Sequence, residues 1–127
     1  MICSYSCPSG FCSCQNELLL NGPLNGAVGE SVEFTLINPP SPPPIRFTWS
    51  FRGNTKNTIV NSFSGGNETQ SNYAGRISVN RTTASLELRG LTHNDTGLYT
   101  VSFFISGVGY RGVTSLTVLG TYFLYIR

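Results

Sequence analysis

Short segments in which apolar and polar residues alternate recur along most of this chain, with turn residues between them. Val32, Phe34 and Leu36 begin a series that returns roughly every 8–15 residues as far as Leu119. A period of two places successive side chains on opposite faces of a strand, so each segment buries one face. The pattern predicts about eight or nine short strands, no helix, and an all-β sandwich of two packed sheets.

The charged residues are few, and this limits the function classes that the chain can support. Of 127 residues only 11% are charged, with one histidine, His93, and one aspartate, Asp95. Acid–base catalysis needs titratable groups that converge on a pocket, and no metal, phosphate or dinucleotide motif is present. A net charge of +2 is also too small for a nucleic-acid footprint. We expect no enzyme, metal, cofactor, small-molecule substrate or nucleic-acid partner.

The two ends of the chain differ from the body. All four cysteines fall in residues 1–17, at Cys3, Cys7, Cys12 and Cys14, without the C-x₂-C spacing of zinc sites. Local disulfides, a metal site and acylation remain open for them. The start lacks the basic residues and apolar run of a secretory signal, so we expect a fragment of a longer precursor or a misassigned first exon. We predict a leader outside the fold at 1–17, one domain at 18–120, and a tail at 121–127.

The most specific motif is Asp95-Thr96-Gly97-Leu98-Tyr99, in which D-x-G-x-Y precedes a strongly alternating strand. It resembles the tyrosine corner of immunoglobulin domains, where the tyrosine hydroxyl bonds back to the backbone. Trp49 stands where such domains place a core tryptophan. Arg76 stands where variable-type domains place an arginine that pairs with the corner aspartate, here Asp95. The resemblance covers about residues 22–119 and implies a V-type immunoglobulin sandwich with Greek-key connections.

The chain departs from that pattern at the two positions of the inter-sheet disulfide, which hold Leu36 and Val101. Such a bond contributes roughly 2–5 kcal/mol to the stability of a domain, and apolar packing can supply part of that stability in its place. A V-type domain without it resembles the N-terminal domain of carcinoembryonic-antigen-related cell adhesion molecules. The segments 81–88 and 91–100 are similar to the signatures of that family. Receptors of the signalling-lymphocyte-activation-molecule kind also lack the bond and remain an alternative, as does a soluble binding or decoy protein.

The resemblance implies an extracellular adhesion or receptor module of the immune type. Its partner would be the same or a related immunoglobulin domain on another molecule, and its membrane anchor would lie in segments absent from this chain. The binding surface would be the sheet of strands G, F, C and C′. Alternation assigns five side chains outward from this sheet: Thr48, Ser50, Thr100, Ser102 and Phe104. Arg52 and Thr58 are further candidates at the rim of the surface.

Three further features concern this surface. Phe104 is the residue we single out as a binding anchor, since exposed aromatics often dominate interfaces, although it could pack under a loop.

Asn67, Asn80 and Asn94 begin N-x-[ST] sequons, which predict N-glycans; plain turn asparagines are the alternative. We expect these glycans on the sheet of strands B, D and E, leaving the other sheet free. Tyr110 could serve either loop packing or contact.

Overall fold

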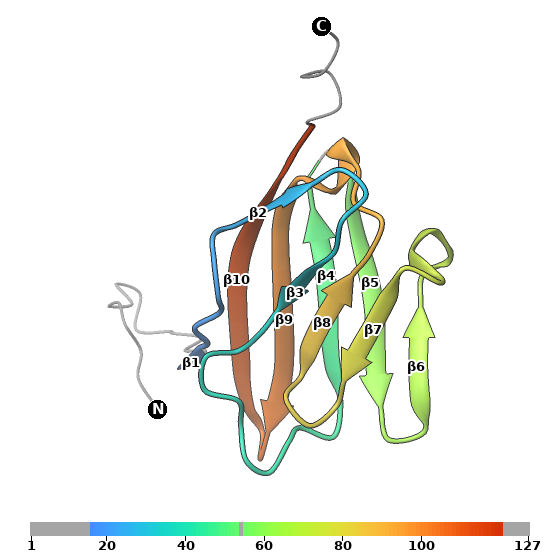
Figure 1. The fold of residues 1–127 in the computed structure, drawn as a ribbon. Helices are drawn as coiled ribbons and strands as arrows, with labels where there is room; N and C mark the ends of the chain where they lie inside the picture. The colour runs from blue at the N-terminus through green and yellow to red at the C-terminus, as the bar shows by residue number, and fades with distance from the viewer. Residues whose placement is uncertain (1–15, 54, 121–127) are drawn as a thin grey trace, which may run out of the picture.

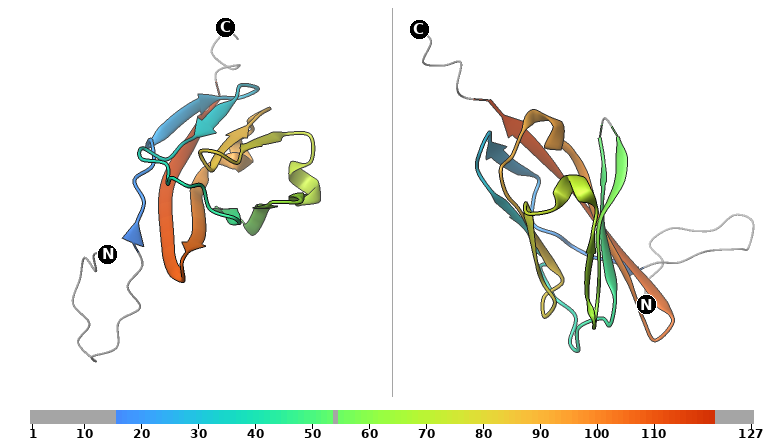
Figure 2. Two further views of the ribbon diagram at one scale, coloured as in Figure 1. Left: turned by 90° about the horizontal axis from the view of Figure 1, so that it is seen from below. Right: turned by 90° about the vertical axis from the view of Figure 1, so that its right-hand side faces the viewer.

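Two β-sheets packed face to face form the domain in the computed structural model, which describes residues 16–53 and 55–120 (Figures 1 and 2). The larger sheet has the order β1-β10-β9-β4-β5-β6, with β2 also paired to β10, and the smaller has the order β3-β8-β7. The predicted all-β sandwich is confirmed. The strands are β1 Asn16–Glu17, β2 Leu24–Ala27, β3 Val32–Phe34, β4 Phe47–Arg52, β5 Lys56–Phe63, β6 Gly66–Thr69, β7 Ile77–Asn80, β8 Ser85–Leu88, β9 Gly97–Ile105 and β10 Val108–Leu119.

The core between the sheets is built on aromatic rings. Trp49, Phe34 and Tyr99 are fully buried, and the centroid of the Phe34 ring lies 4.4 Å from that of Tyr99 and 5.7 Å from that of Trp49. Leu36 and Val101 are buried in the same cluster, and the described residues include no cysteine. Aliphatic side chains therefore stand at the two positions where related domains carry the cysteines of a disulfide. The sandwich lacks that bond.

The segment between β5 and β7 differs in part from its sequence pattern. Residues 61–75 predict a loop with at most a weak strand, yet β5 continues to Phe63 and pairs with β6. All four residues of β6 are exposed, so the strand has no apolar face for alternation to reveal. Single turns of 3₁₀ helix follow at η1, Ser71–Tyr73, and at η2, His93–Asp95.

Strand β1 joins the chain to the edge of the larger sheet. Asn16 and Glu17 pair in parallel with Tyr110 and Arg111 of β10, so the last two residues of the segment assigned to the leader are hydrogen-bonded to the domain. Leu18 then packs against the core. The four cysteines and the tail at 121–127 lie outside the described residues.

Candidate functional site

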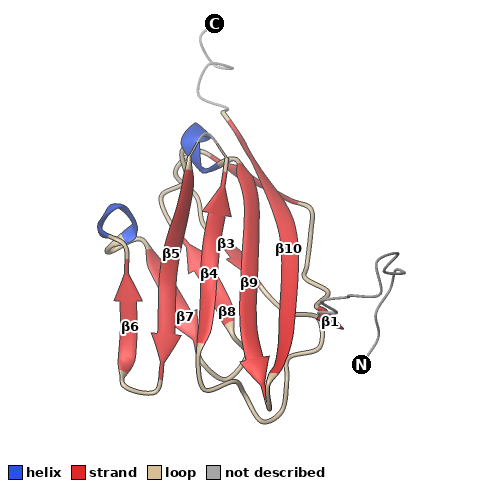
Figure 3. Cartoon of the chain, turned by 180° about the vertical axis from the view of Figure 1, so that it is seen from behind, coloured by secondary structure: helices blue, strands red, loops and turns tan. Residues whose placement is uncertain are grey.

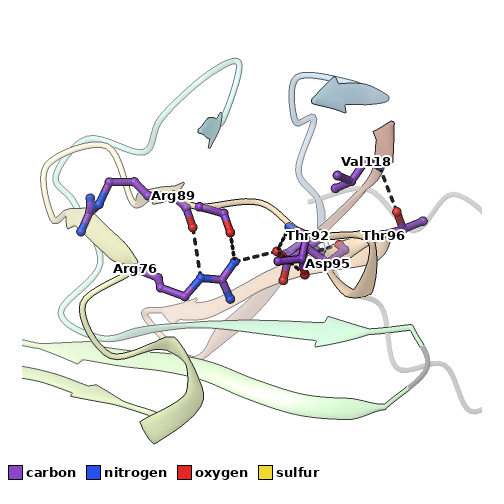
Figure 4. Close-up of polar contacts among 8 residues, drawn as sticks. Arg76, Arg89, Thr92, Asp95, Thr96 and Val118 are labelled. Atoms are coloured by element: carbon purple, nitrogen blue, oxygen red, sulfur yellow. Dashed lines mark hydrogen bonds and ion pairs between the residues drawn. The ribbon is translucent and has the colours of Figure 1, made fainter. Parts of the chain in front are cut away.

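The D-x-G-x-Y motif forms a hydrogen-bonded corner between β8 and β9 (Figure 4). The Tyr99 hydroxyl donates to the carbonyl oxygen of Asp95 at 2.6 Å. Arg76 Nη2 lies 2.6 Å from Asp95 Oδ2, which also accepts a bond from the backbone N–H of Thr92 at 2.9 Å. Burial, with a smaller contribution from the charge of Asp95, raises the pKa of Tyr99. Asp95 is thus engaged in a structural network rather than facing a pocket.

Arg76 ties this corner to the smaller sheet. Its Nε donates to the carbonyl of Arg89, and its Nη2 to the carbonyl of Gly90, each at 3.1 Å (Figure 4). On the other side of the corner, Thr96 Oγ1 accepts the N–H of Val118 in β10 at 2.9 Å. One arginine and one threonine therefore connect the corner to both sheets.

The candidate binding surface is the outer face of the larger sheet, which Figure 3 shows facing the viewer in front of β3, β7 and β8. Strands β10, β9, β4 and β5 of this sheet correspond to strands G, F, C and C′ of the expected fold. The register places Thr48 beside Ser102, and Ser50 between Thr100 and Thr58. Residues of the neighbouring strands β4 and β5 and of β9, which is distant in the sequence, therefore form one continuous polar area, which we call the outer face.

Apolar side chains stand out from this polar area. Phe104 is 68% exposed and lies opposite Gly109 in β10, where no side chain covers it. Leu98 and Val113 are 43% and 42% exposed on the same face. The sequence analysis did not include Leu98 and Val113, although the alternation that assigns Thr100 outward also assigns Leu98 outward. Val113 is found only through its register with Thr100.

Cations lie on the outer face in addition to the predicted Arg52. Lys56 is directly opposite Arg52, and Arg111 is directly opposite Ser102. Arg46 precedes β4, and its guanidinium carbon lies 5.4 Å from the centroid of the Phe63 ring. The sequence analysis did not include these three cations, although alternation from Thr48 and Thr58 also assigns Arg46 and Lys56 outward. Arg111 is found through its register with Ser102.

Hollows lined by described residues border the outer face. One lies at the edge of the larger sheet and is lined by Thr58, Asn61, Glu68, Thr69 and Gln70. Within residues 16–53 and 55–120, no three histidine, cysteine, aspartate or glutamate side chains gather where a metal could bind. In the same ranges, no helix is long and apolar enough to cross a membrane.

The three sequons lie at exposed positions, but one is not where the sequence analysis expected it. Asn80 ends β7 and Asn94 lies in η2, whereas Asn67 lies in β6 at the edge of the larger sheet. The prediction that all sequons lie on the opposite sheet is therefore wrong for Asn67, because the sequence did not reveal β6. Its Oδ1 accepts a bond from the buried Ser62 hydroxyl at 2.8 Å, so the side chain turns away from the outer face.

Tyr110, for which the sequence left two roles open, serves packing. Its ring stacks on Phe103 with centroids 5.5 Å apart, and it is partly buried against the core. Phe103 points inward and Phe104 points outward, so the two neighbouring aromatics of β9 have different surroundings. Tyr110 therefore does not belong to the outer face.

Comparison with known proteins agrees with this geometry. The model of the immunoglobulin V-set domain matches residues 20–119. A crystal structure of murine CEACAM1b matches with a TM-score of 0.63 at 22% identity, covering 84% of this chain and 53% of that one. The CD2-binding domain of CD58 (lymphocyte function-associated antigen 3) matches with a TM-score of 0.61 at 19% identity, covering 75% and 52%.

These two identities establish the fold alone, and this chain spans about half the length of each of those chains. No curated protein matches the sequence. The family assignment rests instead on the V-set match, which covers most of the chain and contains the corner motif, Trp49, Leu36 and Val101. The chain belongs to the immunoglobulin V-set domain family.

Proposed function

We propose that this domain is a non-catalytic, extracellular adhesion or receptor module that binds a protein partner through its outer face. A V-set domain whose structural neighbours are adhesion molecules is consistent with such a role. The CD58 neighbour is a CD2-binding domain, and we propose a partner of the same kind here, a related immunoglobulin domain on another molecule. The exposed ring of Phe104 carries the proposal, since nothing in the described chain covers it.

The two outer surfaces of the sandwich differ in a way that favours this face. On the smaller sheet, the outward residues of β3, β7 and β8 include Glu33, Ser78 and Glu87, and a sequon stands at Asn80. A glycan there would cover that surface. On the larger sheet, Phe104, Leu98 and Val113 are surrounded by short polar side chains, the arrangement of apolar anchors within a polar rim that protein interfaces use.

The module would act at the cell surface, with its anchor in segments absent from this chain. The three exposed sequons support an extracellular location, because N-glycans are added to chains that pass through the secretory pathway. A face on which exposed apolar side chains stand among short polar ones suits recognition of a protein surface.

Substitution of Phe104 tests the proposal. Fluorescent beads coated with the domain are expected to bind a subset of cells from the source organism, and Phe104→Ala should lower that binding at least about tenfold. The matched control is Ile37→Ala, which removes an apolar side chain that is 55% exposed and follows the buried Leu36. Unfolding by urea establishes that both variants fold. Full binding by Phe104→Ala, or loss of binding in the control alone, would contradict the proposal.

A further inference from the structure

The cations of the described chain fall into two groups. Arg76, Arg81 and Arg89 are engaged in the fold: Arg76 pairs with Asp95, Arg81 donates to the Ser62 hydroxyl at 2.9 Å and to a backbone carbonyl, and Arg89 pairs with a glutamate at 3.0 Å. The other cations all lie on the outer face of the larger sheet, and no carboxylate within residues 16–53 and 55–120 forms an ion pair with them. They are Arg46, Arg52, Lys56 and Arg111.

Within this second group, Arg52 and Lys56 lie side by side where β4 ends and β5 begins. They are cross-strand partners on β4 and β5, and both are exposed. Like charges directly opposite each other on a sheet repel, which opposes folding. A local arrangement that works against stability without a compensating contact is commonly found at functional surfaces.

The carboxylates on the same face lie at its two edges. Glu68 is on β6, opposite Asn61, and Glu17 is on β1, beside Arg111. The middle strands therefore present only positive charge. On the opposite sheet, Glu33 and Glu87 are cross-strand partners, and Arg89 forms an ion pair with Glu87.

We propose that the outer face discriminates against a second copy of this chain and binds a protein face that carries carboxylates opposite Arg46, Arg52 and Lys56. This inference rests on the proposed function and specifies its partner. Two copies packed face to face would bring two sets of these cations into one partly desolvated interface, which costs affinity. Phe104 and its apolar neighbours supply contact area for either partner, and the cations select between them.

An acidic version of the same domain serves as the probe. The variant Arg46→Glu/Arg52→Glu/Lys56→Glu reverses these charges and keeps the apolar residues of the face. In analytical ultracentrifugation at about 50 mM NaCl, we expect the native chain alone to be monomeric and to form a mixed dimer with the fluorescently labelled variant. The mixed dimer should weaken at least about tenfold near 500 mM NaCl, and Phe104→Ala in the native chain should abolish it.

A second variant removes the repulsion without creating new attraction. Arg52→Gln/Lys56→Gln should self-associate more strongly than the native chain at low salt. The matched control, Ser31→Glu/Ser78→Glu, lowers the net charge equally at exposed residues near β3 and on β7 and should stay monomeric. Thermal unfolding of each variant excludes misfolding as the cause of any change.

Four outcomes would overturn the inference. Self-association of the native chain at low salt that Phe104→Ala abolishes would show a homophilic face, and would leave the proposed function intact. A native chain that does not bind the acidic variant would remove the charge argument. If Arg52→Gln/Lys56→Gln stays as monomeric as the native chain at low salt, charge repulsion is not what prevents two copies from pairing. Retention on heparin near 150 mM NaCl that this variant loses, in place of mixed dimers, would identify a sulfated polysaccharide as the occupant.

Discussion

Asp95 and Gly97 of the corner motif meet two different physical demands. Asp95 needs a carboxylate because its Oδ2 accepts from both Arg76 and the backbone of Thr92. Gly97 has no room for a side chain, since a Cβ there would lie 2.6 Å from the carbonyl oxygen of Arg52. The motif can therefore be recognised in the sequence because Asp95, Gly97 and Tyr99 each meet a demand of the fold that few other residue types meet.

Removal of the corner arginine should destabilise the domain. Arg76→Met leaves the Asp95 carboxylate, whose side chain is 7% exposed, without its cation, and we expect a loss of about 2–4 kcal/mol in the free energy of unfolding. Arg89→Met is the matched control, because its glutamate partner is 42% exposed, and should cost about 1 kcal/mol. Urea unfolding monitored by tryptophan fluorescence measures both. Equal losses would show that burial of the ion pair does not matter.

Within a single strand, alternation of apolar and polar residues predicts the structure only where one face of that strand is buried. The pattern in β9 is clear because Tyr99, Val101 and Phe103 point into the core and the residues between them do not. In β5 the alternation is broken, since the register shifts after Trp49 and the consecutive Ile59 and Val60 are both buried. Because this bulge interrupts the alternation, the sequence pattern does not reveal the end of β5.

Leu36 and Ile37, which follow β3, test the assignment of inward and outward side chains. Leu36 is 5% exposed in the place of a family cysteine, whereas Ile37 is 55% exposed. Leu36→Ala should therefore cost about 2–4 kcal/mol of unfolding free energy, since it leaves a cavity in the core cluster. Ile37→Ala should change it by less than about 0.5 kcal/mol. Chemical denaturation gives both values, and comparable losses would mean that the two faces have been interchanged.

Charge is distributed unevenly over the whole molecule. The net charge of the chain is only +2, but its charges are not spread evenly. The outer face carries cations without ion pairs among the described residues, and on the opposite sheet two glutamates are cross-strand partners. Only the sandwich creates this polarity, because it places Arg46, Arg52, Lys56 and Arg111 from three strands on one surface. The fold thus gathers charges that are scattered along the sequence onto one surface, and we propose that this surface selects its partner by charge.

The sequons predict a glycoprotein with one uncovered face. Expression in a secretory host should give a mass that falls on enzymatic deglycosylation, and Asn67→Gln, Asn80→Gln and Asn94→Gln should each remove one glycan. The side chain of Asn67 turns inward at the sheet edge, so its glycan should not impair binding by the outer face. Mass spectrometry and the cell-binding assay provide the measurements. An unchanged mass, or stronger binding after loss of the Asn67 glycan, would contradict this arrangement.

The sequence by itself determined the sandwich, the corner at Asp95 to Tyr99, and the outward assignment of Phe104, because these depend on local periodicity and on contacts within short motifs. Only the tertiary structure decided that Lys56 lies against Arg52, that Tyr110 stacks on Phe103, and that Asn67 belongs to the larger sheet. These placements depend on register between strands, and register is set by packing of the complete core, which no single segment encodes.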